Sequence, residues 1–106
     1  MSTNDELYAE AEQLKDSGDL EGAVTKLNEL LAADNDFALA HSALAVYYGR
    51  LGQHDEAIKH GQEVCRIEPN DAFSFTAMSV TYQRAGRIPE AEEAMARAHM
   101  IQQSPR

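Results

Sequence analysis

Apolar and small residues recur along this chain at intervals of three or four positions, and the whole arrangement returns every 34 residues. Glycines at Gly18, Gly52 and Gly86 mark this period. Apolar positions at such intervals predict amphipathic helices, and no strand-like alternation occurs. A fixed period of this length indicates three copies of one structural unit. The copies cover residues 4–37, 38–71 and 72–105.

Each copy is predicted to form two helices joined by a glycine turn. In the middle copy the first helix covers about 39–51, and Gly52 supplies the left-handed residue that ends it. The second helix covers about 55–67 and stops before Pro69, which cannot continue a helix. The predicted fold class is therefore all-α, as one domain over residues 1–106.

Residues at fixed places in the copies resemble the tetratricopeptide repeat. The middle copy carries Leu44-Ala45, Tyr48, Gly52, Ala57 and Pro69, and the third carries Met78-Ser79, Tyr82, Gly86 and Ala91. The first copy keeps Ala11, Leu14, Gly18 and Ala23, with Asn35 in the place of the proline. The resemblance implies an α-solenoid of three helix-turn-helix repeats, with six antiparallel helices in a right-handed superhelix. It also implies a concave groove, lined by the first helices, that binds peptides or protein segments.

The outer faces of the first and last copies are polar where the middle copy is apolar. Toward the preceding copy, the middle copy presents Ala40, Leu44, Tyr47 and Leu51. The same places in the first copy hold Glu6, Glu10, Gln13 and Ser17. At the other end, Glu92 and His99 stand where earlier copies have apolar residues. Terminal repeats need polar outer faces for solubility, so we expect the array to be complete in this chain.

One further stripe of each first helix is expected to face the concave side. The expected groove residues are Tyr8 and Glu12 from the first copy, Leu39, Ser42, Val46, Gly49 and Arg50 from the second, and Phe73, Thr76, Val80, Gln83 and Arg84 from the third. Four of them are expected to form one exposed apolar patch with Tyr8 at its edge, namely Leu39, Val46, Phe73 and Val80. The alternative is that strong curvature buries Leu39 and Val46 between helices.

Arg50 and Arg84 stand one repeat apart beside this patch. They are expected either to hold carboxylates of a bound segment, since arginine binds carboxylates in a bidentate manner, or to pair with Asp16 or neighbouring helices. Members of the family that bind acidic chaperone tails clamp the carboxylates with Lys, Asn and Arg. The corresponding places here hold Tyr8, Glu12, Ala43, Phe73 and Ala77. The resemblance therefore argues against a chaperone tail as partner.

Charge and composition exclude several other classes of function. The formal net charge of −9 argues against nucleic acid as a partner, because phosphate binding needs a basic face. No apolar segment approaches the roughly 20 residues that cross a bilayer, and the N-terminus lacks the pattern of a signal peptide. We therefore expect a cytoplasmic protein with no membrane insertion.

Catalytic, cofactor and metal motifs are missing from the sequence. No phosphate-binding glycine loop, paired-histidine motif or nucleophile with a supporting base occurs, so no enzyme and no cofactor is expected. His41 and His60 could approach each other across a helix pair, and Cys65 stands nearby in sequence. Because these residues lack close ligand spacing, no metal is expected.

The resulting prediction is a non-catalytic adaptor. Its concave groove would bind an amphipathic peptide or helix, a protein segment with apolar and some acidic character. The alternative is a self-associating structural scaffold, in which the same groove mediates a homodimer. A concentration-independent monomer in light scattering would eliminate the second hypothesis.

Overall fold

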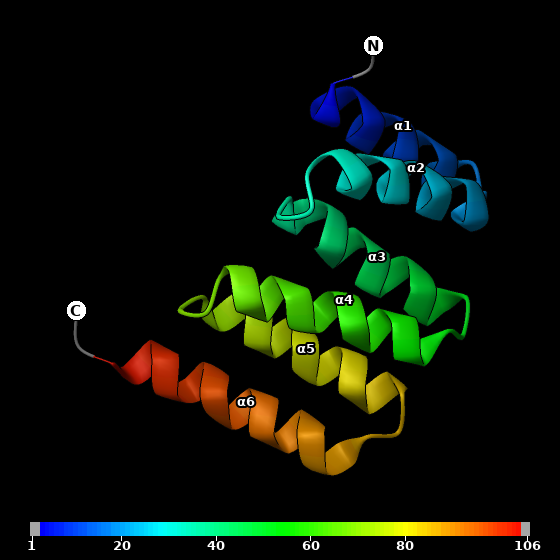
Figure 1. The fold of residues 1–106 in the computed structure, drawn as a ribbon. Coiled ribbons are helices and arrows are strands. Elements are labelled where there is room, and N and C mark those ends of the chain that lie inside the picture. Colours follow the sequence, from blue (N-terminus) through cyan, green and yellow to red (C-terminus); the bar gives the residue numbers. More distant parts are fainter. Residues whose placement is uncertain (1–2, 105–106) are drawn as a thin grey trace.

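The computed structural model describes residues 3–104, which form six α-helices arranged as three antiparallel pairs (Figure 1). The helices are α1 (Asn4–Asp16), α2 (Leu20–Ala33), α3 (Ala38–Arg50), α4 (His54–Ile67), α5 (Ala72–Arg84) and α6 (Ile88–Gln103). The pairs stack one after another from the N-terminus to the C-terminus. The predicted all-α solenoid of three helix-turn-helix repeats is confirmed.

Glycine closes each helix pair in the same way. Gly18, Gly52 and Gly86 have φ angles of 91°, 79° and 77°. In the first turn the amide of Asp19 donates to the carbonyl of Leu14 at 2.8 Å, and the amide of Gly18 donates to that of Lys15 at 3.0 Å. The other two turns repeat both hydrogen bonds one period later. This Schellman closure requires a left-handed residue, which explains the glycine at the repeat interval.

Alanine and serine allow the helices of a pair to approach closely. Ala23, Ala57 and Ala91 lie at equivalent places in the second helices and are almost completely buried. In the third repeat the buried hydroxyl of Ser79 donates a hydrogen bond of 2.8 Å to the carbonyl of Ala91. The largest fully buried apolar side chains are Leu27, Leu30 and Leu44.

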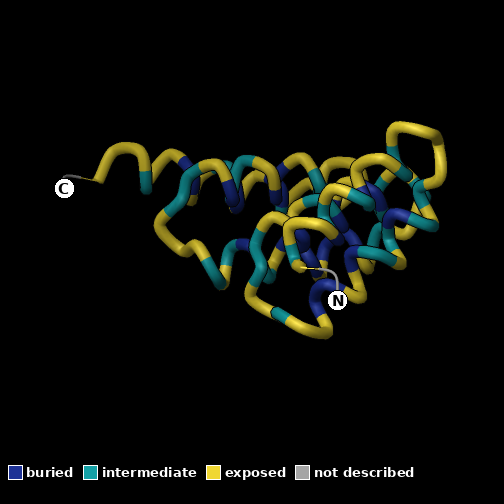
Figure 2. The backbone as a smooth tube through the Cα atoms, turned by 90° about the horizontal axis from the view of Figure 1, so that it is seen from above, coloured by how far each residue is buried: buried dark blue, intermediate teal, exposed yellow. Residues whose placement is uncertain are grey.

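Buried residues follow the inside of the stack, whereas the turns and the C-terminal end of α6 are exposed (Figure 2). The outer face of α1 is polar as expected, since Glu6, Gln13 and Ser17 are exposed and Glu10 is half-buried. On the outer face of α6, Glu92 and His99 are also exposed.

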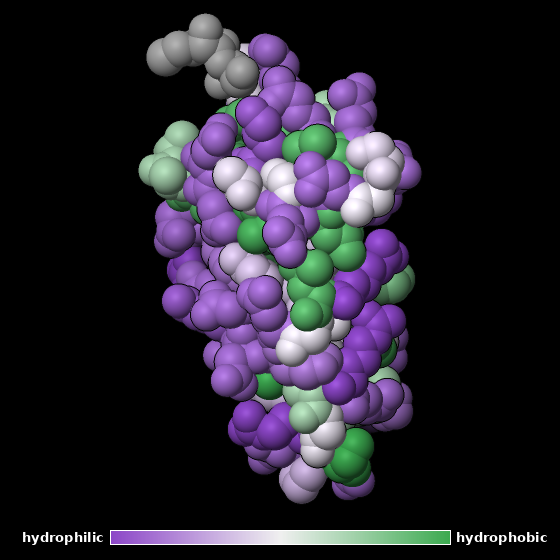
Figure 3. All heavy atoms as spheres, turned by 90° about the vertical axis from the view of Figure 1, so that its right-hand side faces the viewer, coloured by the Kyte–Doolittle hydropathy of each residue, from purple (hydrophilic) through white to green (hydrophobic). Residues whose placement is uncertain are grey.

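The end of the molecule that carries the three glycine turns is mostly hydrophilic, with a narrow band of hydrophobic side chains along its middle (Figure 3). No helix within residues 3–104 has both the length and the apolar character needed to cross a membrane.

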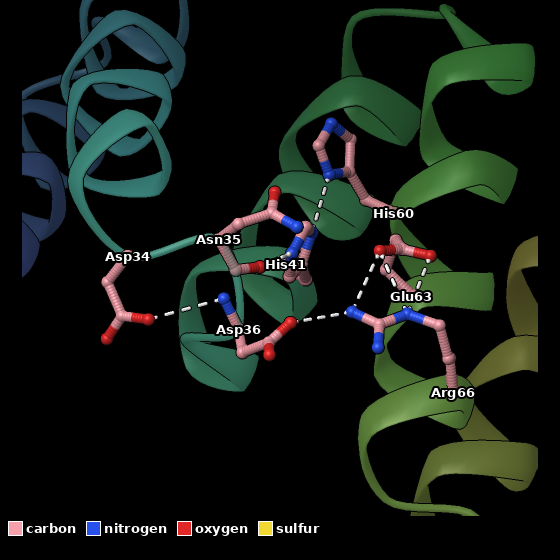
Figure 4. A network of polar contacts seen from close by, with 7 residues as sticks. All are labelled: Asp34, Asn35, Asp36, His41, His60, Glu63 and Arg66. Atoms are coloured by element: carbon pink, nitrogen blue, oxygen red, sulfur yellow. Dashed lines mark hydrogen bonds and ion pairs between the residues drawn. The ribbon is translucent and has the colours of Figure 1, made fainter.

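Two buried histidines join α3 to α4 (Figure 4). Nδ1 of His41 lies 2.9 Å from Nδ1 of His60, and Nε2 of His41 lies 2.7 Å from the carbonyl oxygen of Asn35. A carbonyl oxygen only accepts, so Nε2 of His41 carries its proton. When both rings are neutral, Nδ1 of His41 accepts and Nδ1–H of His60 donates. The ring of Tyr48 stacks on His60 at 5.6 Å.

The connection between α2 and α3 is held by a second set of polar contacts beside this pair (Figure 4). Nη2 of Arg66 on α4 donates to Asp36 at 2.7 Å, and its Nε donates to Glu63 at 3.2 Å. The backbone amide of Asp36 donates to the carboxylate of Asp34 at 3.3 Å. The side chains of Arg66 and Asp36 are exposed and that of Glu63 is half-buried, so we expect these contacts to orient the connection more than they stabilise it.

Cys65 does not join the histidine pair. Its thiol donates to the carbonyl oxygen of Ser74 on α5 at 3.6 Å. Burial raises the pKa of this thiol to about 11, with a smaller contribution from Asp71. Within residues 3–104, no three histidine, cysteine, aspartate or glutamate side chains lie close enough together to hold a metal ion.

Candidate partner-binding groove

An open pocket of about 550 Å³ lies between α3 and α5, and we refer to it as the groove. Helix α3 contributes Ala38, Leu39, Ser42, Ala45, Val46 and Arg50. Helix α5 and the residue before it contribute Asp71, Phe73, Ser74, Ala77, Met78, Val80, Thr81 and Arg84. Gly61, Val64 and Glu68, from α4 and its C-terminal end, complete the lining. The walls are therefore mostly apolar, and charged residues stand among them only at a few places.

Seven of the residues that the sequence assigned to a groove line it. They are Leu39, Ser42, Val46 and Arg50 on α3, and Phe73, Val80 and Arg84 on α5. The four large apolar ones are exposed, with relative accessibilities of 59% for Leu39, 40% for Val46, 84% for Phe73 and 39% for Val80. Leu39 and Val46 are thus not buried between helices. A pocket rimmed by exposed apolar side chains is typical of a binding surface.

The other five residues lie outside the groove lining. Gln83 and Glu12 are exposed, and Gly49 is half-buried with no heavy atom near a Cβ built on it. The hydroxyl of Thr76 donates to the carbonyl of Ala72 at 3.1 Å, one turn earlier in its own helix. These residues sit on the first helices, and none of them lines the groove.

Tyr8 packs against Phe37 instead of extending the apolar patch. The two rings have their centroids 6.3 Å apart, and Phe37 belongs to the connection before α3. Burial raises the pKa of Tyr8, and the neighbouring Glu12 raises it further. No residue of α1 lines the groove, which is formed by the second and third repeats.

Gly61 is a groove residue that sequence reasoning missed. It lies buried on α4, and a Cβ built there would be 2.7 Å from the sulfur of Met78 on α5. The absence of a side chain at Gly61 therefore lets Met78 lie against α4. A glycine inside a helical pattern is the one signal in the sequence that could have pointed to this close approach.

Positive and negative groups lie at opposite ends of the groove. Arg50 and Arg84 are the last residues of α3 and α5, which run in the same direction. Asp71 precedes the first residue of α5, and Glu68 follows the last residue of the antiparallel α4. Apolar side chains line the space between these charged ends.

Neither arginine forms an ion pair within the described part of the chain. Asp16, a potential partner of Arg50, instead pairs with Lys15 at 2.9 Å. At the other end, a hydrogen bond with Asp71 raises the pKa of Glu68, and burial and the charge of Asp71 add to the shift. The acidic end of the groove is therefore a pair of neighbouring carboxyl groups.

Comparisons with known proteins give matches over most of the length of this chain. Residues 13–105 match the family model described as the N-terminal tetratricopeptide repeat region of Psidin. A curated relative, the small glutamine-rich tetratricopeptide repeat-containing protein 2 of Mycosarcoma maydis, is 28% identical over 98 residues. The match covers 86% of this chain and 28% of that protein, so this chain spans little more than a quarter of its length.

Solved structures share the architecture. The crystal structure of MamA aligns with a TM-score of 0.86 at 20% identity, covering 94% of this chain and 58% of that one. The second tetratricopeptide repeat domain of Spaghetti (RPAP3), bound to the HSP90 peptide SRMEEVD, aligns with a TM-score of 0.81 at 17% identity. That match covers 92% of this chain and 91% of the other. At these identities the likeness shows the fold alone.

Proposed function

Because this chain belongs to the tetratricopeptide repeat family, we propose that it is a non-catalytic adaptor whose groove binds a segment of another protein. The observation that carries the proposal is the exposure of Leu39, Val46, Phe73 and Val80 around one open pocket. Folding alone gives no reason to leave four large apolar side chains in water at a shared place. The cytoplasmic location expected from the sequence is part of this proposal.

The expected affinity follows from the exposed apolar area. Covering these four side chains contributes about 1 kcal/mol or more each, since between 39% and 84% of each residue is exposed. Association and the ordering of the segment offset much of this gain. We therefore expect dissociation constants of about micromolar or weaker.

The chemistry of the lining favours an amphipathic peptide or helix with some acidic character. Its apolar side chains would contact Val46, Phe73 and Val80, and its acidic groups would meet Arg50 and Arg84. At the places where family members that clamp a chaperone tail carry Lys, Asn or Arg, the groove of this chain has Phe73 and Ala77. An acidic tail such as that bound by the Spaghetti domain is thus not the expected ligand.

The test is a selection from a display library of random peptides of about 12 residues, a length that spans the groove when helical. Selected peptides should bind the wild type, and the double variant Phe73→Ser/Val80→Ser should bind them at least tenfold more weakly. The variant should keep its helicity and thermal stability, since both side chains are exposed.

A matched control replaces exposed apolar residues outside the groove. Ile88 and Met100 are 50% and 61% exposed and do not line it, so Ile88→Ser/Met100→Ser should leave peptide affinity unchanged. Equal losses in both double variants would contradict a groove-specific site. A concentration-dependent dimer that only the Phe73→Ser/Val80→Ser variant dissolves would replace the adaptor with a self-associating scaffold.

A further inference from the structure

The two ends of the groove carry opposite charges, which sets a direction along it. A direction for the bound segment rests on the proposed peptide-binding function. We infer that the partner segment has an apolar centre between a basic end and an acidic end, and that its acidic end lies at Arg50 and Arg84. The basic end of the segment then lies at Glu68 and Asp71, at the opposite end of the groove.

The arrangement of the helices places these charges. Since α3 and α5 run in the same direction, their last residues, Arg50 and Arg84, reach the same end of the groove. Helix α4 runs the opposite way, so its C-terminal end brings Glu68 to the end where α5 starts. All four side chains line the groove. Two positions of the same sign therefore stand at each end.

The folded chain leaves these charges available to a partner. Among residues 3–104, the ion pairs are made by lysines and arginines that do not line the groove. Neither Arg50 nor Arg84 takes part in one. The carboxyl group of Glu68 has the carboxyl group of Asp71 as its neighbour instead of a cation. A basic side chain of a bound segment would relieve the repulsion between two like charges.

The length of the helices gives the spacing of the partner's charges. Leu39 and Arg50 lie at opposite ends of α3, and eleven steps of about 1.5 Å separate them by roughly 16 Å. A helical segment spans this distance in about 11 residues. An extended segment, at about 3.3 Å per residue, spans it in about five.

A comparison of two peptides tests the charge order. The tightest peptide from the library selection is synthesised in two forms, one with acidic and basic end residues in the selected order and one with the two ends exchanged. We expect the wild type to bind the form with the selected order about three- to tenfold more tightly than the exchanged form. The difference is no larger because exposed ion pairs are individually weak. The preference should vanish at about 1 M salt, where the screening length is about 3 Å.

Charge reversal on the protein should exchange the preference. The triple variant Arg50→Glu/Arg84→Glu/Glu68→Lys should bind the second form more tightly than the first. Asp71 is left in place because its carboxylate accepts from the amide of Phe73 at 3.0 Å and caps α5. The control Arg87→Glu removes an arginine that pairs with Glu90 outside the groove and should leave the preference unchanged.

A nitroxide label on the acidic end of the peptide reports its position directly. It should broaden the amide resonances of the turn at 51–53 more strongly than those of Glu68, Asn70 and Asp71 at the opposite end. The reverse pattern, or equal affinity of the two peptide forms, would overturn the inferred direction. The proposed function would still stand if Phe73→Ser/Val80→Ser lost peptide binding. If no peptide binds, or if Phe73→Ser/Val80→Ser binds as well as the wild type, the proposed function itself is wrong.

Discussion

The buried histidine pair should make the stability of this solenoid fall between about pH 7.5 and pH 5.5. His41 and His60 share one hydrogen bond between their Nδ1 atoms, and Nε2 of His41 is committed to the carbonyl of Asn35. Only one proton fits between the two Nδ1 atoms. A cationic His41 and a His60 protonated on Nδ1 would direct two N–H groups at each other.

The sign of the effect follows from the pKa of His60. Burial, and then the nearby His41, lower this pKa below the ordinary value. In the unfolded chain the imidazole takes up a proton near pH 6.5, whereas in the folded chain it does so only at lower pH. Since the unfolded state then binds more protons, the free energy of unfolding decreases as the pH falls below about 6.5.

The size of the effect has an upper limit. If His60 stayed neutral in the folded chain down to about pH 5.5, the loss would be about 1.4 kcal/mol. The side chain of His60 keeps a small exposed fraction of 9%, and Glu56 and Glu63 nearby favour its charged form. Screening by solvent and these carboxylates keep the expected loss below this limit.

Urea unfolding followed by circular dichroism measures this loss in wild type and in His60→Asn. Asparagine keeps a side-chain donor near the position of Nδ1 but does not titrate. The free energy of unfolding of the variant should therefore change less than that of the wild type between about pH 7.5 and pH 5.5. Glu68 has a raised pKa and acts in the opposite direction, but both proteins share it and it cancels in the difference. His99→Asn, at an exposed site, is the matched control. Equal pH dependence of wild type and His60→Asn would refute the reasoning.

Two further predictions concern the backbone and the cysteine. Gly52→Ala should destabilise the fold by about 1–2 kcal/mol because Gly52 has a φ of 79°, and a urea midpoint that does not fall would contradict this. Gly49→Ala inside α3 should stabilise the fold by up to about 1 kcal/mol because no atom of another element lies within 4 Å of the added Cβ, and a urea midpoint that falls would contradict this. The thiol of Cys65, with a pKa of about 11, should react with iodoacetamide near pH 8 at least tenfold more slowly in the folded chain than in urea, and equal rates would contradict its buried environment.

The helices could be predicted closely because their ends are marked locally. The helices predicted at about 39–51 and 55–67 are found at Ala38–Arg50 and His54–Ile67. Gly52 ends the first through a backbone conformation that only local sequence dictates, and a proline follows the second. The exposure of Leu39 and Phe73 also follows from their place on the first helices, once the repeat is aligned.

The remaining features of the groove depend on contacts between residues far apart in the sequence. The periodic pattern assigns groove residues to first helices alone, yet Gly61 and Val64 of α4 contribute to the lining. Phe37 stands in a connection without helical periodicity, and its contact with Tyr8 could not be derived from either residue alone. The angle between neighbouring repeats decides such contacts, and no single repeat encodes it.

The close approach of Met78 to Gly61 places the spacing of α4 and α5 under the control of two buried residues that line the groove. Exchanging volume between them, for instance by Gly61→Ala with a shorter residue at position 78, would alter how far α5 stands from α4 and so the width of the groove. The charged ends and the exposed apolar rim would stay unchanged. Selectivity for thick or slender ligands could thus be adjusted, by evolution or by an engineer, independently of which chemical groups the adaptor recognises.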